Sequence, residues 1–125
     1  MQSRRRFDAE LLFVPDYPVC QLTLRIHSDM PDERVGEVEK IIACQNAVVA
    51  PARFRLIEDY GYFLIYEADI VFSEAGVSAD FMEVIVDEAV SRFDFCWSAI
   101  VLANSGDKSA SEALSCVENK LGCAR

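Results

Sequence analysis

The 125-residue chain holds few side chains whose type and spacing could perform chemistry. His27 is its single histidine, and histidine is the side chain that most often serves as a general base near neutral pH. It lies beside Arg25 on the polar side of an alternating segment, and no G-x-S-x-G nucleophile motif accompanies it. A lone residue without a partner motif is weak evidence for a site, so we predict a surface histidine and expect no enzyme activity.

Acidic residues recur at helical spacing in the second half of the chain. Asp80, Glu83 and Asp87 would line the outer side of one helix, followed by Ser91 and Asp94. Paired carboxylates serve acid–base chemistry, and hard metal ions need converging oxygen ligands. Ligands along one helix face cannot surround an ion without a second element, so these acids predict a solvated polar face. The five glycines form no phosphate-binding loop, and we expect no metal, nucleotide or other cofactor.

The five cysteines are odd in number, and no pair has the C-x-x-C spacing of a zinc or redox site. Cys20, Cys44 and Cys96 lie in apolar stretches, where a free cysteine behaves as a small buried hydrophobic residue. We therefore predict reduced, buried thiols. Cys116 and Cys123 lie seven residues apart and could share a helix face, which leaves redox or metal chemistry open there.

Charge narrows the classes of partner. Twelve basic against 21 acidic residues give a net charge of −9, which disfavours both sequence-independent nucleic-acid binding and docking on an anionic membrane. The longest uncharged windows, Ile41–Ala52 and Phe95–Gly106, are shorter than the about 20 residues that a membrane-spanning helix needs. Ser3–Phe7 partly matches the twin-arginine export pattern, but Asp8 and Glu10 fall where the apolar region of that pattern should begin. We expect a cytoplasmic protein.

Strand-like segments come in adjacent pairs, which restricts how the elements can lie. Glu10–Val14 is a short apolar run, and Cys20–Ile26 alternates apolar and polar residues with a period of two. The second pair is Ala52–Leu56 and Tyr62–Phe72, joined by a hairpin turn in which Gly61 can take a positive φ. Adjacent pairs of this kind indicate antiparallel pairing.

Helical periodicity follows each pair of strands. Ser28–Glu33 predicts a helix start, and one buried helical face follows it: Val35, Val38, Ile41 and Ile42. Ser78 predicts the N-cap of a long helix that runs to about Ala103. Ser109 and Glu112 have the spacing of a capping box before a short amphipathic helix.

The order strand, strand, helix, strand, strand, long helix, short helix predicts the α+β class. An antiparallel β-sheet would be packed mainly on one face by the long C-terminal helix and the shorter middle helix. We expect residues 1–104 to form a single domain and residues 105–125 a tail that holds the short amphipathic helix.

A set of features between about Leu22 and Leu102 resembles a known family. The features are Gln21–Ile26, Pro31–Arg34, Asn46, Phe54–Asp59, Gly61, Tyr66–Ile70, Gly76–Ser78 and Phe93–Trp97. They resemble the YbjN family, which is described as bacterial regulators of sensory transduction and has a fold similar to that of type III secretion chaperones. The resemblance implies a non-enzymatic, chaperone-like or regulatory protein. Chaperones of similar fold dimerise and hold an extended segment of a client protein along their surface.

The chain departs from the family at its start. The family usually opens with an amphipathic helix before the first strand, whereas this sequence has a triple-arginine leader at that place. The tail helix, Ala110–Leu121, is our candidate for covering the surface that the missing helix would have filled.

Two apolar surfaces are left over once a core is assigned. On the long helix, the side opposite the expected core face carries Phe81, Val84, Glu88, Arg92 and Phe95. We predict that a second copy of the chain covers this stripe in a homodimer, with the tail helix, through Leu114, Val117 and Leu121, as the alternative cover.

The second surface belongs to the long strand, where Phe63 and Ile65 share the nominally exposed side with Glu67 and Asp69. A strand that is apolar on both faces is typical of one covered on both sides or contacting a partner. The leader or the tail helix could be the cover, and a protein partner is the open alternative.

These observations favour a protein that binds another protein through sheet and helix surfaces, without turnover. The alternative function is a small-molecule sensing domain with a pocket between the sheet and the long helix. Because the chain is strongly acidic, we expect the protein partner to carry a basic patch.

Overall fold

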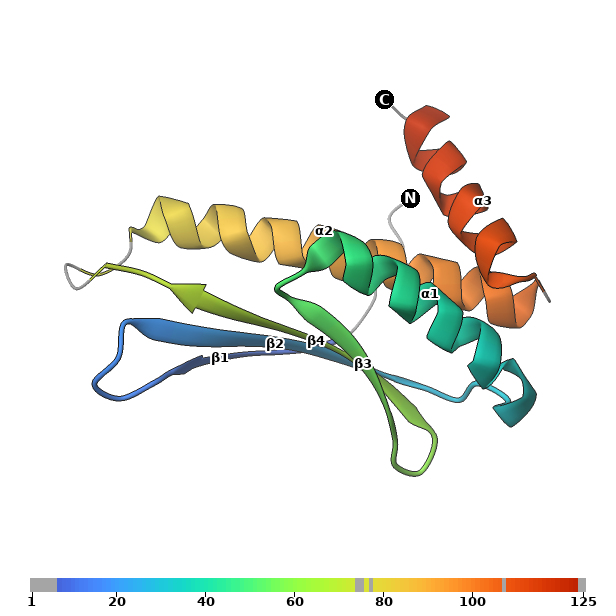
Figure 1. The fold of residues 1–125 in the computed structure, drawn as a ribbon, viewed down its shortest axis with the longest axis horizontal. Coiled ribbons are helices and arrows are strands. Elements are labelled where there is room, and N and C mark those ends of the chain that lie inside the picture. Colours follow the sequence, from blue (N-terminus) through green and yellow to red (C-terminus); the bar gives the residue numbers. More distant parts are fainter. Residues whose placement is uncertain (1–6, 74–75, 77, 107, 124–125) are drawn as a thin grey trace.

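The computed structural model describes residues 7–73, 76, 78–106 and 108–123, with the backbone alone for 120–123 (Figure 1). The predicted order of elements and the α+β class are confirmed. Among the described residues, no helix is both long and apolar enough to cross a membrane. The elements are β1 (Asp8–Phe13), β2 (Val19–Ser28), the 3-10 turn η1 (Asp32–Arg34), α1 (Val35–Val49), β3 (Arg53–Glu58), β4 (Tyr62–Val71), α2 (Ala79–Ser105) and α3 (Ala110–Cys123).

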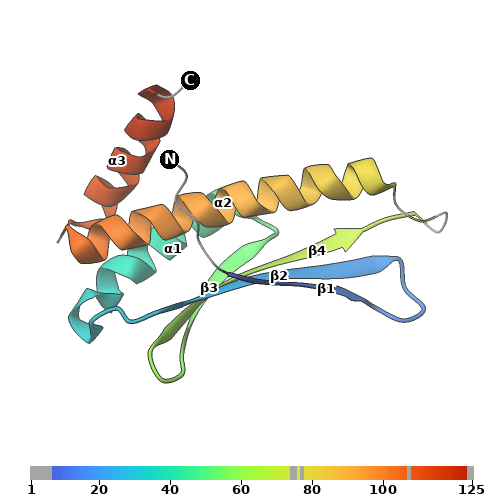
Figure 2. The ribbon, with the colours of Figure 1, turned by 180° about the vertical axis from the view of Figure 1, so that it is seen from behind.

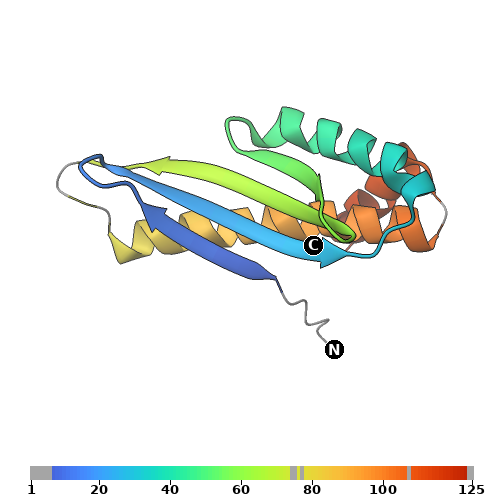
Figure 3. The ribbon, with the colours of Figure 1, turned by 90° about the horizontal axis from the view of Figure 1, so that it is seen from below.

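The four strands form one antiparallel sheet in the order β1-β2-β4-β3. The turn between β3 and β4 carries positive φ at Tyr60 and at the predicted Gly61. All helices lie on one side of the sheet (Figures 1 and 2). Seen from below, the opposite face of the sheet is open, with β1 and β3 at its two edges (Figure 3). We call this side the open face.

The core lies between the sheet and the helices, as the period-two and helical patterns predict. Each strand contributes its alternate residues, because successive side chains of a strand point to opposite faces. The most deeply buried side chains are Cys20, Leu22, Leu24, Phe54 and Leu64 from the strands, Val38, Ile41 and Val49 from α1, and Phe93, Cys96 and Ile100 from α2. Burial raises the pKa of the Cys96 thiol to about 12, which keeps this cysteine protonated and inert.

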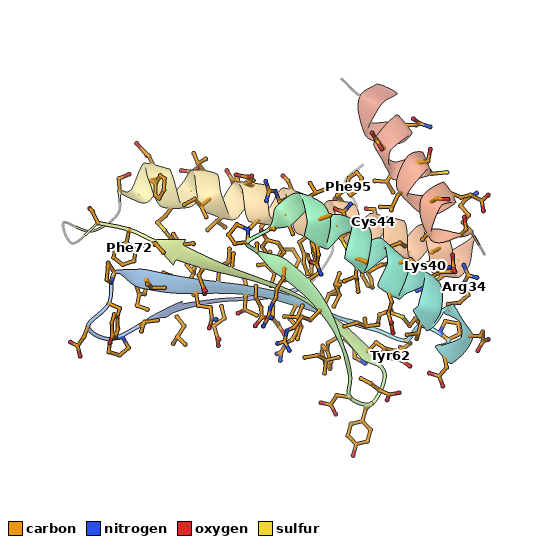
Figure 4. All side chains as sticks on the ribbon, in the orientation of Figure 1. Arg34, Lys40, Cys44, Tyr62, Phe72 and Phe95 are labelled. Atoms are coloured by element: carbon orange, nitrogen blue, oxygen red, sulfur yellow. The ribbon has the colours of Figure 1, made fainter. Side chains whose placement is uncertain are left out.

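The cysteine prediction is wrong at one position. Cys20 and Cys96 are buried, but Cys44 is exposed on the outer side of α1 (Figure 4). It follows the buried Ile42 by two positions, a rotation of about 200° around the helix, which turns it away from the core. Cys116 is also exposed, and the side chain of Cys123 lies outside the described residues, so the pairing of these two stays untested.

Two side chains at the start of α1 hold the connection between α2 and α3. The Arg34 guanidinium donates to the main-chain oxygens of Ala103, at 2.9 Å, and of Lys108. The Glu37 carboxylate accepts from the main-chain N–H of Ala110 at 2.9 Å. A cation therefore meets the C-terminal end of α2 and an anion meets the N-terminal end of α3, the favourable sign at each helix end.

The predicted capping box starts α3. The main-chain N–H of Ser109 donates to the Glu112 carboxylate, and the N–H of Glu112 donates to the Ser109 hydroxyl. The predicted N-cap of α2 is also present, since the Ser78 hydroxyl accepts from the N–H of Phe81. Helix α3 buries Ala110, Ala113 and Val117, and its contacts are with α1 and α2.

The Asn46 side chain acts as a short substitute for a neighbouring strand. Its amide oxygen accepts from the main-chain N–H of Phe54 at 2.6 Å, and its amide nitrogen donates to the Phe54 oxygen at 3.1 Å. The main-chain N–H and C=O of Phe54 point away from β4, at the edge of β3 opposite the one that pairs with β4. Asn46 thus ties the end of α1 to the outer edge of β3.

We predict that Asn46→Ala destabilises the fold by about 1–3 kcal/mol, because it leaves the main-chain groups of Phe54 without a partner. Urea unfolding followed by circular dichroism measures this loss. The matched control is Val48→Ala, two positions along the same helix and 70% exposed, which we expect to change stability by less than about 0.5 kcal/mol. Equal effects of the two substitutions would contradict the role of Asn46.

The Glu37 contact predicts a pH dependence of the docking of α3. The N–H of Ala110, together with Lys40, lowers the pKa of Glu37, so the ionised form is the one that the fold stabilises. This contribution is present at neutral pH and is lost as the pH falls toward about 4 and below, where carboxylates protonate. We expect the amides of Ala113 and Val117 to lose protection from hydrogen exchange in acid before the central strands do. Glu37→Gln should reproduce the loss at neutral pH, whereas substitution of the exposed Glu39 by Gln should not.

Candidate functional site

A groove of about 280 Å³ lies on the helix side of the sheet and opens to solvent. Three parts of the chain form it: the first half of α2, the C-terminal half of β4, and the corner between α1 and β3. The lining residues used below are Val49–Ala52 from the corner, Tyr66 and Ala68–Val71 from β4, and Phe81, Ile85, Glu88, Ala89 and Arg92 from α2. We call this site the β4 groove. A second hollow, next to Ser73, Gly76 and Ser78, shares Val71 and Phe81 with it and continues it along the end of β4.

The groove exists because β3 is shorter than β4. The first residue of β3, Arg53, lies opposite Glu67, so Ala68–Val71 continue without a β3 neighbour. The residue before this strand that would lie opposite Asp69 is Pro51, which has no N–H to donate.

The free stretch of β4 has unpaired main-chain groups. The N–H of Phe72 donates to Pro18, next to β2, so the even-numbered residues of β4 direct their main-chain groups toward β2. Asp69 and Val71 therefore direct theirs to the other side, where no described residue pairs with them. The groove thus combines apolar side chains with the donors and acceptors of a strand edge.

The opposite end of the groove is polar. Glu88 and Arg92 form an ion pair within α2 at 2.5 Å, and the Tyr66 hydroxyl lies next to them. Burial raises the pKa of Tyr66, and the neighbouring Arg92 acts in the opposite direction. Tyr66 therefore stays a neutral donor at physiological pH, and together with Arg92 it could bind a carbonyl or carboxylate oxygen of a partner.

The structure brings together only part of the predicted helix stripe. Phe81, Glu88 and Arg92 line the β4 groove. Val84 is 63% exposed and lies outside the groove. Phe95 is half-buried and packs against the core (Figure 4). Helix α3 contacts α2 near the C-terminal end of α2, so it leaves Phe81 and Val84 uncovered, while the predicted contact through Leu121 lies outside the described residues (Figure 1).

Phe63 and Ile65, the other predicted contacts, lie on the open face. Ile65 is only 9% exposed, because Arg25 and Arg55 are its direct neighbours on the adjoining strands. The Arg25 guanidinium lies 5.4 Å from the centre of the Phe63 ring, and His27 contacts the same ring edge-on. The alternative that the tail helix covers this face is wrong, since α3 lies on the helix side (Figure 2). The leader lies outside the described residues.

Part of the charge on the open face is internally paired. The Glu67 carboxylate accepts from Arg55 at 2.6 Å and from Arg53 at 3.3 Å. Burial alone would raise the pKa of Glu67, but the two arginines outweigh it and lower the pKa. Arg25 pairs with Asp8, and His27, which is exposed as predicted, bonds the main-chain oxygen of Tyr60. These pairs, together with the exposed carboxylates of Glu10 and Asp69 on the same side, make the open face a surface of mixed charge.

Sequence reasoning found Phe81, Glu88 and Arg92 of the groove but missed its other lining residues. Tyr66 and Ala89 are core residues and Ile85 packs against the core, and one edge of each borders the groove. Among the corner residues Val49–Ala52, only Pro51 indicated in the sequence that pairing stops here. A proline follows the end of a helix and has no N–H to donate to a neighbouring strand.

No family model and no curated protein matches the chain. Among solved structures, it is similar to the crystal structure of "YbjN, a putative transcription regulator from E. coli", with a TM-score of 0.56 and 13% sequence identity. The similarity covers 80% of this chain and 70% of that chain. It shows a shared fold, which confirms the structural part of the resemblance, while membership of the family stays a prediction.

The different burial of the α2 residues predicts different costs of substitution. Phe95→Asp places a charge against the core and should cost about 2 kcal/mol or more. Val84→Asp should cost less than about 0.5 kcal/mol, since the side chain is mostly in water. Thermal unfolding of both variants at equal concentration measures the difference. Val84, and not Phe95, is therefore the position at which a contact made by this stripe can be tested without unfolding the protein.

Proposed function

We propose that the chain is a non-catalytic, regulatory or chaperone-like binding domain that holds a segment of another protein in the β4 groove. The observation that carries the proposal is the unpaired end of β4, Ala68–Val71, beside the apolar residues Phe81 and Ile85 of α2. An extended peptide needs both features, because main-chain hydrogen bonds supply affinity and side-chain pockets supply specificity. The likeness to a structure described as a regulator supports a role of this kind.

Charge specifies the chemistry of the partner segment. Asp69 lies at the edge of the groove with its side chain on the open-face side of β4, and the exposed residues Asp80, Glu83 and Asp87 lie on the outer side of the same half of α2. In a chain of net charge −9, these acids favour a segment that carries Lys or Arg beside apolar residues. Association should therefore be faster at low ionic strength, where the attraction is less screened.

The shape of the groove favours a peptide over a small molecule. Small-molecule pockets enclose about 300–1,000 Å³ and bury most of the ligand surface. The β4 groove, at about 280 Å³, is near the lower bound of that range, but it is open to solvent and continues past Phe81 into the neighbouring hollow, so it would leave much of a small ligand in water. Its position between the sheet and the long helix matches the alternative function predicted from the sequence, so a small ligand is the alternative to be tested.

We predict that Phe81→Asp abolishes capture of the protein partner. The wild type, Phe81→Asp and the control Val84→Asp are immobilised and incubated with lysate of the source cells, and bound proteins are quantified by mass spectrometry. Both sites are exposed on the same half of α2, but only Phe81 lines the groove. The wild type and Val84→Asp should retain one stoichiometric protein that Phe81→Asp loses by about tenfold or more.

Two results would contradict the proposal. Equal capture by all three proteins would place the binding surface elsewhere. Absence of any stoichiometric protein, together with a small molecule that copurifies with the wild type and is lost from Phe81→Asp in native mass spectrometry, would establish the ligand-sensing alternative instead.

A further inference from the structure

The edge strand β1 is exposed along its whole length. All six of its residues are exposed, including three consecutive large apolar ones: Leu11 at 44%, Leu12 at 55% and Phe13 at 56%. Its pairing with β2 is continuous from Asp8 to Phe13, without a bulge, and the strand contains no proline or lysine. Bulges, prolines and charged side chains normally protect a sheet edge. In β1 the charges are confined to Asp8 and Glu10, so the half Leu11–Phe13 is left unprotected.

One hydrogen bond shows which main-chain groups of β1 point outward. The N–H of Val14 donates to Val19, so the even-numbered residues of this strand bond to β2. Ala9, Leu11 and Phe13 therefore direct their N–H and C=O groups outward, where no described residue pairs with them. The free edge presents three donors and three acceptors in a row.

We propose that β1 pairs antiparallel with β1 of a second copy, about a two-fold axis at Leu11. In this register Leu11 lies opposite Leu11 of the other copy, and Ala9 lies opposite Phe13, so every outward N–H and C=O of the three residues is paired. The two sheets join into one of eight strands, four from each copy, with the helices of both copies on the same side.

The sequence of β1 selects this register over its neighbours. An axis at Glu10 would set the two Glu10 carboxylates directly opposite each other, which is destabilising. An axis at Leu12 would set Ala9 opposite Pro15, which has no N–H to donate and lies beyond the strand. With the axis at Leu11, Glu10 lies opposite Leu12, and Asp8 keeps its ion pair with Arg25 at 3.2 Å.

A second copy fits this edge because the strand is self-complementary. It offers Leu11 and Phe13 on the helix side and Leu12 on the open face, and each copy supplies the apolar surface that the other would cover. The proposed contact is a single pair of six-residue strands, whereas stable interfaces bury about 1,200 Å² or more, so we expect the dimer to be reversible. The edge lies across the sheet from β3, so pairing leaves the β4 groove accessible and does not depend on the proposed function (Figure 3).

Hydrogen exchange of the wild-type protein tests the proposal directly. Amide exchange is measured by NMR at concentrations from about 5 µM to about 500 µM, alongside sedimentation velocity. The amides of Ala9, Leu11 and Phe13 should exchange freely in the monomer and become protected by about tenfold or more in the dimer. The amides of Glu10 and Leu12, which bond to β2, should be protected at both concentrations and serve as the internal control.

Substitutions supply the second test. Leu11→Pro removes an N–H that is unpaired within one copy, so it should give a folded monomer by sedimentation and circular dichroism. The control Val84→Asp, at a similarly exposed site on α2, should remain dimeric. A wild type that is monomeric at every concentration overturns the proposal, and so does a dimer whose Ala9, Leu11 and Phe13 amides stay unprotected. Dissociation by Val84→Asp but not by Leu11→Pro would assign the dimer to the α2 stripe. If Leu11→Pro does not fold, the exchange data of the wild type decide.

Discussion

The fold depends on the pairing of β2 with β4. These two ten-residue strands run side by side from Val19 opposite Val71 to Ser28 opposite Tyr62. Their helix-side residues supply most of the sheet's share of the core, and α1 and α2 pack on that side only. The two outer strands are shorter, and they are offset: β1 pairs with Cys20–Arg25, whereas β3 pairs with Tyr62–Glu67 at the other end of the ladder. The unpaired end of β4 follows from this offset, and the exposure of β1 follows from its place at the edge of the sheet.

Local patterns predicted the elements well because their causes are local. The alternation in β2, the Ser78 and Ser109 caps and the Gly61 turn each depend on a few neighbouring residues, and all are present. The core face of the sheet followed from the same alternation. What the pattern could not supply was register between strands, and the β4 groove is a product of register, since it exists only because β3 starts opposite Glu67.

Burial that depends on tertiary contacts was also beyond the patterns. Ile65 lies on the solvent side of its strand, yet Arg25 and Arg55 cover it from both neighbouring strands. Ala99 and Ala103 are fully buried because α1 and α3 meet α2 there, and an alanine gives no periodic signal of such a contact. Cys44 shows the reverse case, since an apolar stretch of sequence on a helix still has an outer side.

Asn46 has a consequence for how large an assembly of this chain can become. A sheet with two open edges can add copies without limit, because each new copy presents the edge that the next one needs. Here the outer side of β3 is occupied at Phe54 by the Asn46 amide, which takes up both main-chain groups of that residue, and Pro51 precedes the strand. The two edges of the sheet are therefore unequal. Copies cannot add edge to edge without limit into a fibre, because the β3 edge of every molecule is blocked at Phe54.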